Sequence, residues 1–297
     1  MEEKKRPWLC TLFTQLFLCI ALYIALNLGR PPRFTYRNSY SNGGPLDTYF
    51  ISVKGGYRTL EQQSRLLKKM EKVALIYKVR FVVNVGETGE DDPLSQNASR
   101  IFQSLHIPWY TTRASNSPND GCFVKEIIIT HDKVLHIVGV NTVSVQESMK
   151  STGGFHDNQL NCLTQTLEAT SGNWLVVVGY HSVVVCEENK EQIKPKQIHK
   201  SLQDIFLKYG VDAYLSTHSC INYTYQGAVA HIGVLDRTPG ISHLARRSKR
   251  SSFPNINMVD GFLLHRVNHL EITTYAVTID GEVVSRSTIQ QRGREAV

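Results

Sequence analysis

The sequence predicts an α/β domain that is preceded by one membrane-spanning helix. Short runs of β-branched and aromatic residues alternate with stretches in which apolar residues recur at helical spacing, and this alternation predicts the domain. Residues 8–28 form 21 consecutive residues without a charged side chain, which predicts the membrane helix. With 297 residues, of which 41% are hydrophobic, the chain can bury a sizeable core.

The charge pattern gives no support for a nucleic-acid partner. The net charge of +7 is modest for 297 residues, and no basic stretch is interleaved with aromatic side chains. Nucleic-acid-binding domains carry a concentrated basic patch or stripe. We therefore expect no nucleic-acid binding.

Residues 8–28 are long enough to cross a bilayer as a helix. A cleaved signal peptide is the alternative, because residues 4–6 are basic, as the start of such a peptide is. The apolar stretch is longer than the core of a signal peptide, about 7–15 residues, and residues 27–29 make a poor cleavage site. We therefore expect a signal anchor at 8–28 with a cytoplasmic tail at 1–7.

Two features place the rest of the chain on the lumenal or extracellular side. Asn97 and Asn222 each begin an Asn-x-Ser/Thr sequence, which is glycosylated on that side of a membrane. Four cysteines follow the anchor: Cys122, Cys162, Cys186 and Cys220. They could form one or two disulfides in an oxidising compartment, but the sequence does not fix their pairing. We expect a single-pass type II membrane protein.

The start of the domain predicts a parallel pair of strands. Residues 29–46 have the composition of a linker, which leaves residues 47–297 as the domain. A strand at 48–53, a helix at 60–77 and a buried strand from Phe81 then follow in order. This order predicts a βαβ crossover, whose two strands are parallel.

The remaining elements are predicted from the same patterns. Helices are expected at residues 101–107, 157–171 and 198–209. Strands are expected at residues 126–130, 133–140, 174–179, 211–215, 227–234, 271–278 and 283–287. The last two are joined by Asp280-Gly281 and predict a hairpin.

Acidic residues follow directly after the buried strand that begins at Phe81. Gly86 ends this strand, and four acids come next: Glu87, Glu90, Asp91 and Asp92. Acids at the carboxyl end of a buried strand lie where open α/β sheets place ligands. Carboxylates so close together repel one another, and a cation or a basic partner would relieve that repulsion. A solvated acidic loop without a ligand is the alternative.

Polar turns follow several of the predicted strands and form five blocks. The blocks are FISVKGGY at 50–57, FVVNVGETGEDD at 81–92, WYTTRASNS at 109–117, WLVVVGYH at 174–181 and YLSTHSC at 214–220. In order and spacing they resemble a small purple acid phosphatase, a member of the calcineurin-like metallophosphoesterases, over residues 47–286. The resemblance implies a four-layer αββα sandwich, with two mixed β-sheets face to face and helices outside.

The resemblance also implies which residues stand at the family's functional positions. Gly55 stands where a metal-binding Asp belongs, and Glu87 where an Asp bridges two metals. Glu90 replaces the Tyr that gives the family its colour. In the third block, Ser115 replaces an Asn ligand and Asn116 replaces the His that handles protons.

The last two blocks have changed as well. Tyr180 stands where a ligand His belongs, with His181 next to it. His218 is retained, whereas Cys220 replaces the second His of its block. Gly offers no side chain, and neutral Ser and Tyr are weak ligands. The resemblance therefore implies that the two-metal centre needed for phosphate-ester hydrolysis is lost, and we expect no cofactor.

Two interpretations of the site follow. We expect a membrane-anchored, catalytically inactive protein that binds an unidentified protein or a phosphate-containing ligand. The alternative is a weak or mononuclear metal-dependent phosphate-ester hydrolase that holds one Zn or Fe ion. Its candidate ligands are Glu87, Glu90, His181, His218 and Cys220.

The basic stretch at residues 246–250 has two interpretations. Arg-x-Lys-Arg before a serine is the pattern that basic-specific secretory proteases cut, which would place cleavage after Arg250. An exposed basic loop is the alternative.

Overall fold

The computed structural model describes the chain in twelve ranges: 13–22, 47–102, 105–113, 122–130, 133–142, 158–170, 174–189, 192–197, 200–217, 223–226, 228–234 and 260–291. The chain divides into two units, Met1–Tyr40 and Ser41–Val297. In the first unit, residues 13–22 form a helix. No helix within the described ranges is long and apolar enough to cross a membrane. The expected tail at 1–7 and linker at 29–46 lie outside these ranges.

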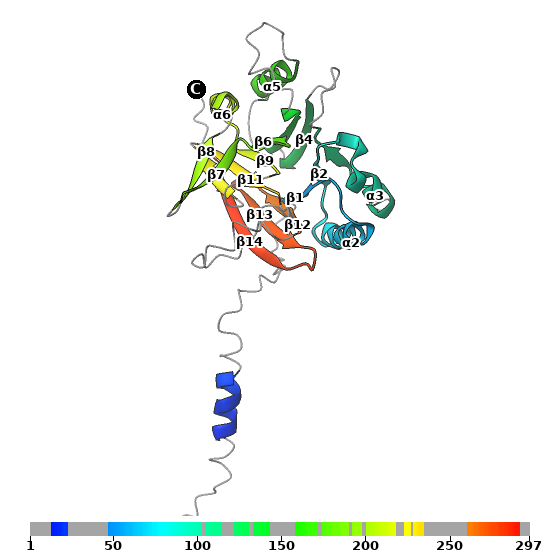
Figure 1. Ribbon diagram of the computed structural model, residues 1–297, viewed down its shortest axis with the longest axis vertical. Helices are drawn as coiled ribbons and strands as arrows, with labels where there is room; N and C mark the ends of the chain where they lie inside the picture. The colour runs from blue at the N-terminus through cyan, green and yellow to red at the C-terminus, as the bar shows by residue number, and fades with distance from the viewer. Residues whose placement is uncertain are drawn as a thin grey trace, which may run out of the picture. The chain divides into compact units, whose positions relative to one another are not determined.

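The first sheet has six strands in the order β14-β13-β12-β1-β2-β3 (Figure 1). Its strands are β1 (Thr48–Lys54), β2 (Phe81–Val85), β3 (Trp109–Thr111), β12 (Gly261–Val267), β13 (Glu271–Thr278) and β14 (Val283–Gln290). β1, β2 and β3 are parallel, which confirms the predicted crossover, and the other neighbours pair antiparallel. The carboxyl ends of β1, β2 and β3 therefore lie at one edge of this sheet.

The second sheet also has six strands, in the order β10-β11-β9-β6-β5-β4. Its strands are β4 (Phe123–Thr130), β5 (Lys133–Val140), β6 (Trp174–Gly179), β9 (Ala213–Ser216), β10 (Tyr223–Gln226) and β11 (Val229–Gly233). β5, β6, β9 and β11 are parallel. Strands β7 (Val184–Asn189) and β8 (Gln192–Gln197) form a separate hairpin.

The two sheets pack face to face around one apolar core. From the first sheet, Val83 and Val85 point inward, because alternate residues of a strand share a face. From the second sheet, Ile137 and Val176 meet them. Trp174 anchors the same core and donates its indole N–H to the carbonyl of Asn268 at 2.7 Å. This packing confirms a mixed α/β sandwich.

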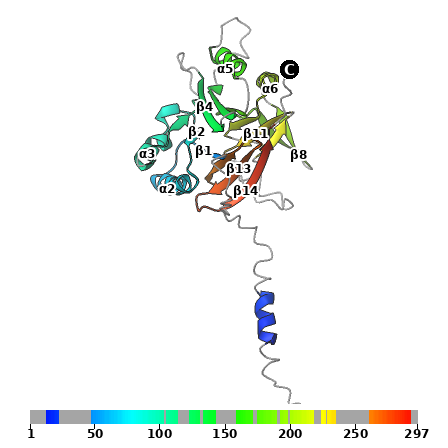
Figure 2. The same ribbon diagram turned by 180° about the vertical axis from the view of Figure 1, so that it is seen from behind.

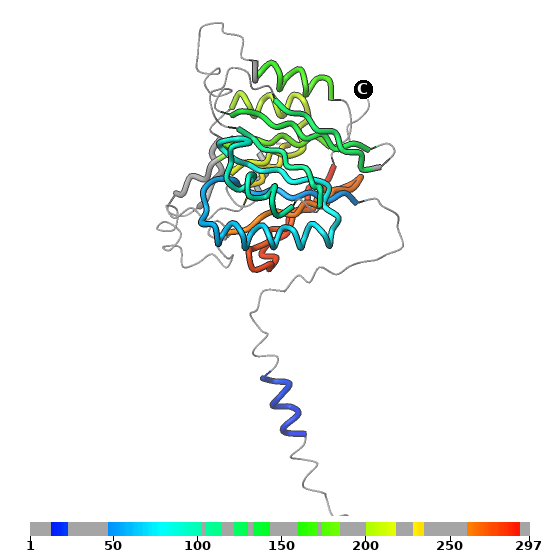
Figure 3. The backbone as a smooth tube through the Cα atoms, turned by 90° about the vertical axis from the view of Figure 1, so that its right-hand side faces the viewer, coloured from blue at the N-terminus to red at the C-terminus, as the bar shows by residue number. Residues whose placement is uncertain are grey.

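Helices cover the outside of both sheets. They are α2 (Leu60–Tyr77), α3 (Pro93–Ile101), α5 (Asn158–Ala169) and α6 (Lys200–Lys208), and a short 3₁₀ helix, η1, spans Gly89–Asp91. Leu163 of α5 and Phe206 of α6 pack with Val177 on the outer face of the second sheet. α2 lies on the opposite side of the sandwich, beside the first sheet, so that helices form the two outer layers (Figures 2 and 3).

One disulfide joins Cys122, next to β4, to Cys162 of α5. It fixes the start of an edge strand to the helix that covers the sheet. It also gives the pairing that the sequence left open for these two cysteines. The side chains of Cys186 and Cys220 lie outside the described residues.

The bounds of α2 follow from its sequence. Thr59 caps its amino end, with reciprocal hydrogen bonds to Gln62 that make a capping box. Its buried face carries Leu66, Met70 and Val73 at helical spacing. The predicted bounds of 60–77 are confirmed.

Other predicted elements need correction. The helix expected at 101–107 is instead α3, at Pro93–Ile101, because Asp92 caps it and Pro93 occupies its first turn. Trp109–Thr111, which directly follows the expected helix, forms β3. The predicted hairpin is confirmed, because β13 and β14 pair antiparallel, and β12 is a further strand that pairs with β13.

Candidate functional site

The residues that follow the parallel strands of both sheets gather at one edge of the sandwich. Gly55 follows β1 and Glu87 lies two residues after β2, whereas Tyr180 and His181 follow β6 of the other sheet. Thr142 lies two residues after β5. The strand ends that the sequence grouped thus lie at one edge, the kind of edge at which open α/β sheets place ligands.

The space in which a side chain at position 55 would stand is filled. A Cβ atom placed on Gly55 would lie 2.4 Å from Oδ2 of Asp92 and 2.7 Å from Oδ1 of Asn84. Both distances are too short for ordinary van der Waals contact. Gly55 is thus required by Asp92 and Asn84, both of which are completely buried.

Asp92 holds three parts of the edge together. Its Oδ2 accepts a hydrogen bond from the backbone N–H of Gly56 at 2.6 Å. Its Oδ1 accepts from the backbone N–H of Leu94 and from Nδ2 of Asn84, both at 3.0 Å. The carboxylate therefore caps α3 and ties it to β2 and to the turn after β1. Asp92 does not belong to a solvated acidic loop.

Asn84 of β2 is oriented by these contacts. Its Nδ2 donates to Asp92 and also to Oγ of Ser95 at 2.9 Å. Its Oδ1 is buried and has no hydrogen-bond partner among the described residues. This oxygen points at the position that a Cβ of residue 55 would occupy.

Glu87 faces Tyr180 across the two sheets. The Tyr180 hydroxyl donates to Oε2 of Glu87 at 3.4 Å, so the contact joins the end of β2 to the end of β6. The backbone carbonyl of Tyr180 is held by the hydroxyl of Thr217 at 2.8 Å. Tyr180, which stands at a ligand His position in the resemblance, therefore makes a hydrogen bond to the carboxylate opposite.

His181 is held in one orientation. Its Nδ1 lies 2.8 Å from Oγ1 of Thr142, and its backbone carbonyl accepts from the hydroxyl of Tyr214 at 2.6 Å. Burial lowers the pKa of His181, and the negative charge of Glu87 offsets part of that effect. The imidazole is therefore favoured in its neutral form.

The described residues do not fit a two-metal centre. Gly55 offers no ligand, and the buried carboxylate beside it is already used by backbone and side-chain donors. Within the described ranges, no group of three or more His, Cys, Asp or Glu side chains could hold a metal ion. Within those ranges Glu87, Glu90 and His181 do not form such a group by themselves, and the two other candidates, His218 and Cys220, lie outside the described residues.

The other predicted site residues divide into two groups. Ser115, Asn116, Asn222 and Arg250 also lie outside the described residues. Asn97 lies in α3, where its Nδ2 donates to Oε1 of Gln63 in α2. Glu90 is exposed on η1 and lines a neighbouring pocket.

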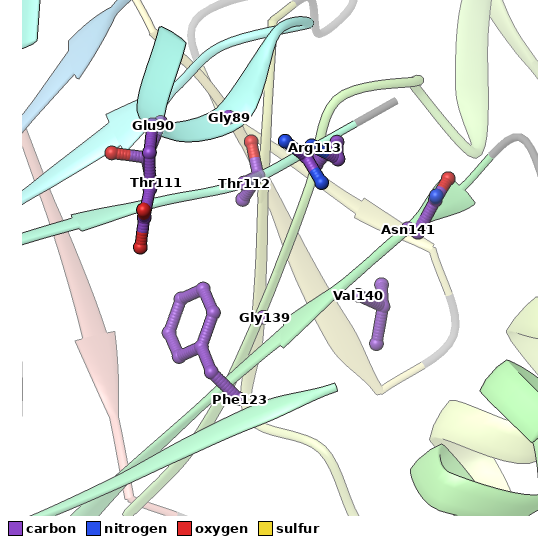
Figure 4. A pocket seen from close by; sticks show the side chains of 9 residues that line it. All are labelled: Gly89, Glu90, Thr111, Thr112, Arg113, Phe123, Gly139, Val140 and Asn141. Atoms are coloured by element: carbon purple, nitrogen blue, oxygen red, sulfur yellow. The ribbon is translucent and has the colours of Figure 1, made fainter. Parts of the chain in front are cut away.

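Sequence reasoning missed this pocket, which has a volume of about 300 Å³ (Figure 4). Arg113, two residues after β3, and Asn141, next to β5, contribute to it from the two different sheets. The signal that the sequence offered is Arg113, a charged residue within the block at 109–117. Asn141 could not be paired with it before the sheets were placed face to face.

Comparison with known proteins identifies the fold. No protein-family model and no curated protein sequence matches the chain. Among solved structures it is similar to GAP50, described as the anchor in the inner membrane complex of Plasmodium, with a TM-score of 0.59 and 15% identity over 84% of this chain and 90% of that chain. 

Two further structures are similar at lower scores. A dimetal phosphatase from Danio rerio has a TM-score of 0.48 and 10% identity, over 84% of this chain and 100% of its own. Vps29 from Chaetomium thermophilum has a TM-score of 0.41 and 10% identity, over 82% of this chain and 100% of its own. Likeness at such identities concerns the fold alone. With its two mixed sheets and outer helices, the chain shares the fold of the GAP50 structure.

Proposed function

We propose that this chain is a membrane-anchored, catalytically inactive relative of the purple acid phosphatases that acts by binding. One observation carries the proposal: the carboxylate of Asp92 occupies the space that a side chain at position 55 would need. Hydrolysis by a two-metal centre requires ligands that clamp both ions. At this position the chain has no ligand and no room for one.

The opposite sheet supports the same conclusion. Tyr180, at the end of β6, donates a hydrogen bond to Glu87, at the end of β2. A neutral phenol is a poor ligand, and a carboxylate that accepts its hydrogen bond is partly engaged. The hydrogen bond between Tyr180 and Glu87 therefore joins the two sheets at this edge without an ion.

A membrane-anchored location is part of the proposal. Residues 8–28 are the anchor, and the domain lies in a lumenal or extracellular compartment, as in a type II protein. The Cys122–Cys162 disulfide supports this side, because such bonds persist in oxidising compartments. The description of the similar Plasmodium protein as a membrane-complex anchor is consistent with it. The occupant of the edge is an unidentified protein or a phosphate-containing ligand.

Metal content and hydrolysis test the proposal. The full chain, purified in detergent, is expected to contain no stoichiometric metal by mass spectrometry after incubation with Zn²⁺ or Fe²⁺ and desalting. Its hydrolysis of an aryl phosphate should equal that of the matched Glu87→Gln variant, which keeps the size of the side chain. Two bound ions with hydrolysis that Glu87→Gln abolishes would overturn the proposal.

One observation favours the alternative of a mononuclear hydrolase. The charge of Glu87 affects the pKa of His181, so a carboxylate and an imidazole from different sheets lie near each other. In this alternative, one tightly held Zn or Fe ion is lost from both His181→Ala and His218→Ala. A metal content near zero in the unsubstituted chain eliminates it.

A further inference from the structure

The pocket next to the Tyr180–Glu87 contact is lined by one negatively charged residue, Glu90, and one positively charged residue, Arg113. It lies between the end of β3 in the first sheet and the end of β5 in the second, with a volume of about 300 Å³. In Figure 4, Glu90 and Phe123 lie toward Thr111, whereas Arg113 lies between Thr112 and Asn141. A volume of this size is at the lower end of those that enclose small ligands.

The Arg113 side chain is partly exposed at the pocket, and one of its contacts is a weak ion pair. Its guanidinium lies 3.7 Å from Oδ2 of Asp91, whose side chain is 80% exposed. An ion pair this long and this exposed contributes little stability. The guanidinium is itself 32% exposed and offers the planar donor geometry that a carboxylate or phosphate accepts in pairs.

Glu90 decides which anions can enter. It is exposed and lines the same pocket as Arg113. A phosphate monoester, with a charge near −2, would be attracted by Arg113 and repelled by Glu90. A ligand with one carboxylate and one ammonium group would satisfy both side chains at once.

Part of the pocket wall is apolar. The ring of Phe123 lies directly over Gly139, where an added Cβ would meet the ring at 1.9 Å. Only a residue without a Cβ at position 139 leaves room for the Phe123 ring, and Val140 adds a second apolar side chain to the pocket. This wall suits the short aliphatic or aromatic body of a small ligand.

We propose that the pocket binds a small zwitterion with an apolar side chain, namely a free amino acid or a dipeptide. Arg113 holds its carboxylate, Glu90 accepts hydrogen bonds from its ammonium group, and its side chain packs on Phe123. This assignment rests on the proposed function in one respect, that the domain acts by binding. It departs from the phosphate-ester chemistry that the resemblance implies.

Calorimetric titration of the full chain in detergent tests the assignment with four probes: leucine, glycyl-leucine, glycyl-leucinamide and N-acetyl-glycyl-leucine. Leucine and glycyl-leucine separate an amino acid from a dipeptide as the better ligand. The amide lacks the carboxylate and the acetyl derivative lacks the ammonium group, so each should bind about tenfold more weakly than glycyl-leucine.

Two variants connect each probe to one side chain. Arg113→Gln should bind glycyl-leucine and its amide equally, and Glu90→Gln should bind glycyl-leucine and its acetyl derivative equally. Lys68→Gln, which removes an exposed charge on α2, should behave like the unsubstituted chain. Circular dichroism of each variant controls for folding.

The outcomes separate this inference from the proposed function. Failure of leucine and glycyl-leucine to bind at millimolar concentrations, or binding that both pocket variants leave unchanged, overturns the zwitterion site. Neither result bears on metal content or hydrolysis. Conversely, bound metal with phosphatase activity would overturn the proposed function and leave the titrations standing.

Discussion

The Tyr180 hydroxyl and Oε2 of Glu87 lie 3.4 Å apart, and this hydrogen bond connects the carboxyl end of β6 to that of β2 across the sandwich. Because the contact is exposed, it should stabilise the fold only slightly. We expect Tyr180→Phe to lower the free energy of unfolding by about 0.5–1 kcal/mol in urea titrations.

A double-mutant cycle with Glu87→Ala isolates this contact. Because alanine removes the acceptor, the coupling between the two substitutions should be favourable to the native pair, about 0.5 kcal/mol. A coupling of zero would mean that the hydroxyl and the carboxylate do not interact in solution.

Gly55 and Asp92 should be strongly coupled. Gly55→Ala places a methyl group 2.4 Å from the buried Asp92 carboxylate, and the overpacking should cost about 1–3 kcal/mol. Asp92→Ala should cost about 2–4 kcal/mol, because it removes the cap of α3 and the acceptor for Gly56. In the Asp92→Ala background the Gly55→Ala change should cost less, since only the contact with Asn84 then remains. Additive losses of unfolding free energy would contradict the steric account.

These two residues also show what the sequence could and could not predict. Position 55 was recognised from the order of the blocks, and the loss of its ligand could be read from the residue type alone. The sequence could not show that the side chain of Asp92, 37 residues later, fills the space beside Gly55. That placement depends on how α3 packs on β2. The acidic run favoured a ligand site or a solvated loop, whereas one of its acids is a buried helix cap.

The predictability of the fold follows the same division. α2 was predicted with its exact bounds because its apolar residues repeat at helical spacing, and the structure adds the capping box that starts it. α3 was misplaced because its start signal, Asp92-Pro93, sits inside the acidic run. The Arg113–Asn141 pocket was missed because its two sides come from different sheets, a relationship that no local pattern encodes.

Two buried histidines should make the fold sensitive to acid. Burial lowers the pKa of His231 to about 4 and that of His265 to about 3. In the unfolded chain both histidines have a pKa of about 6.5. Between the folded pKa and pH 6.5, the unfolded chain therefore binds more protons than the folded chain. The free energy of unfolding should therefore be fully retained above pH 6.5. It should fall as the pH is lowered, by about 1.4 kcal/mol per pH unit for each histidine.

Urea titrations between pH 5 and pH 7 measure this dependence. His231 has no partner for either ring nitrogen among the described residues, so His231→Leu should remove its share of the slope at little cost at neutral pH. His265 bonds to Ser52 and Thr274, so the cost of His265→Leu at neutral pH should be larger. An unchanged slope in His231→Leu would show that this residue does not titrate on unfolding.

The Cys122–Cys162 disulfide should contribute substantially to stability. The cysteines are 40 residues apart, and closing a loop of that length in the unfolded chain corresponds to about 4 kcal/mol in the chain-entropy account. Replacing both by serine should therefore lower the free energy of unfolding by about 2–4 kcal/mol in urea titrations. Cys19→Ser, at a free cysteine of the first unit, is the matched control and should have no effect. Equal stability of the two variants would contradict the role given to the disulfide.

The glycosylation state tests both the compartment and the packing of α3. Nδ2 of Asn97 is the atom that would carry a glycan. It donates a hydrogen bond to Oε1 of Gln63, a buried residue of α2. A sugar on that nitrogen would leave it only one N–H and would crowd the contact between α3 and α2, so we expect Asn97 to remain unmodified in the folded protein. Asn222 then carries the glycan of a lumenal domain.

Mobility shifts after glycosidase treatment of membranes distinguish these cases. The unsubstituted chain and Asn97→Gln should show the same single shift, and Asn222→Gln should show none. Two shifts would mean that α3 accepts a glycan and that its packing on α2 differs from the structure. The absence of any shift in all three proteins would contradict the lumenal location, because Asn222-Tyr223-Thr224 would then never have met the glycosylation machinery.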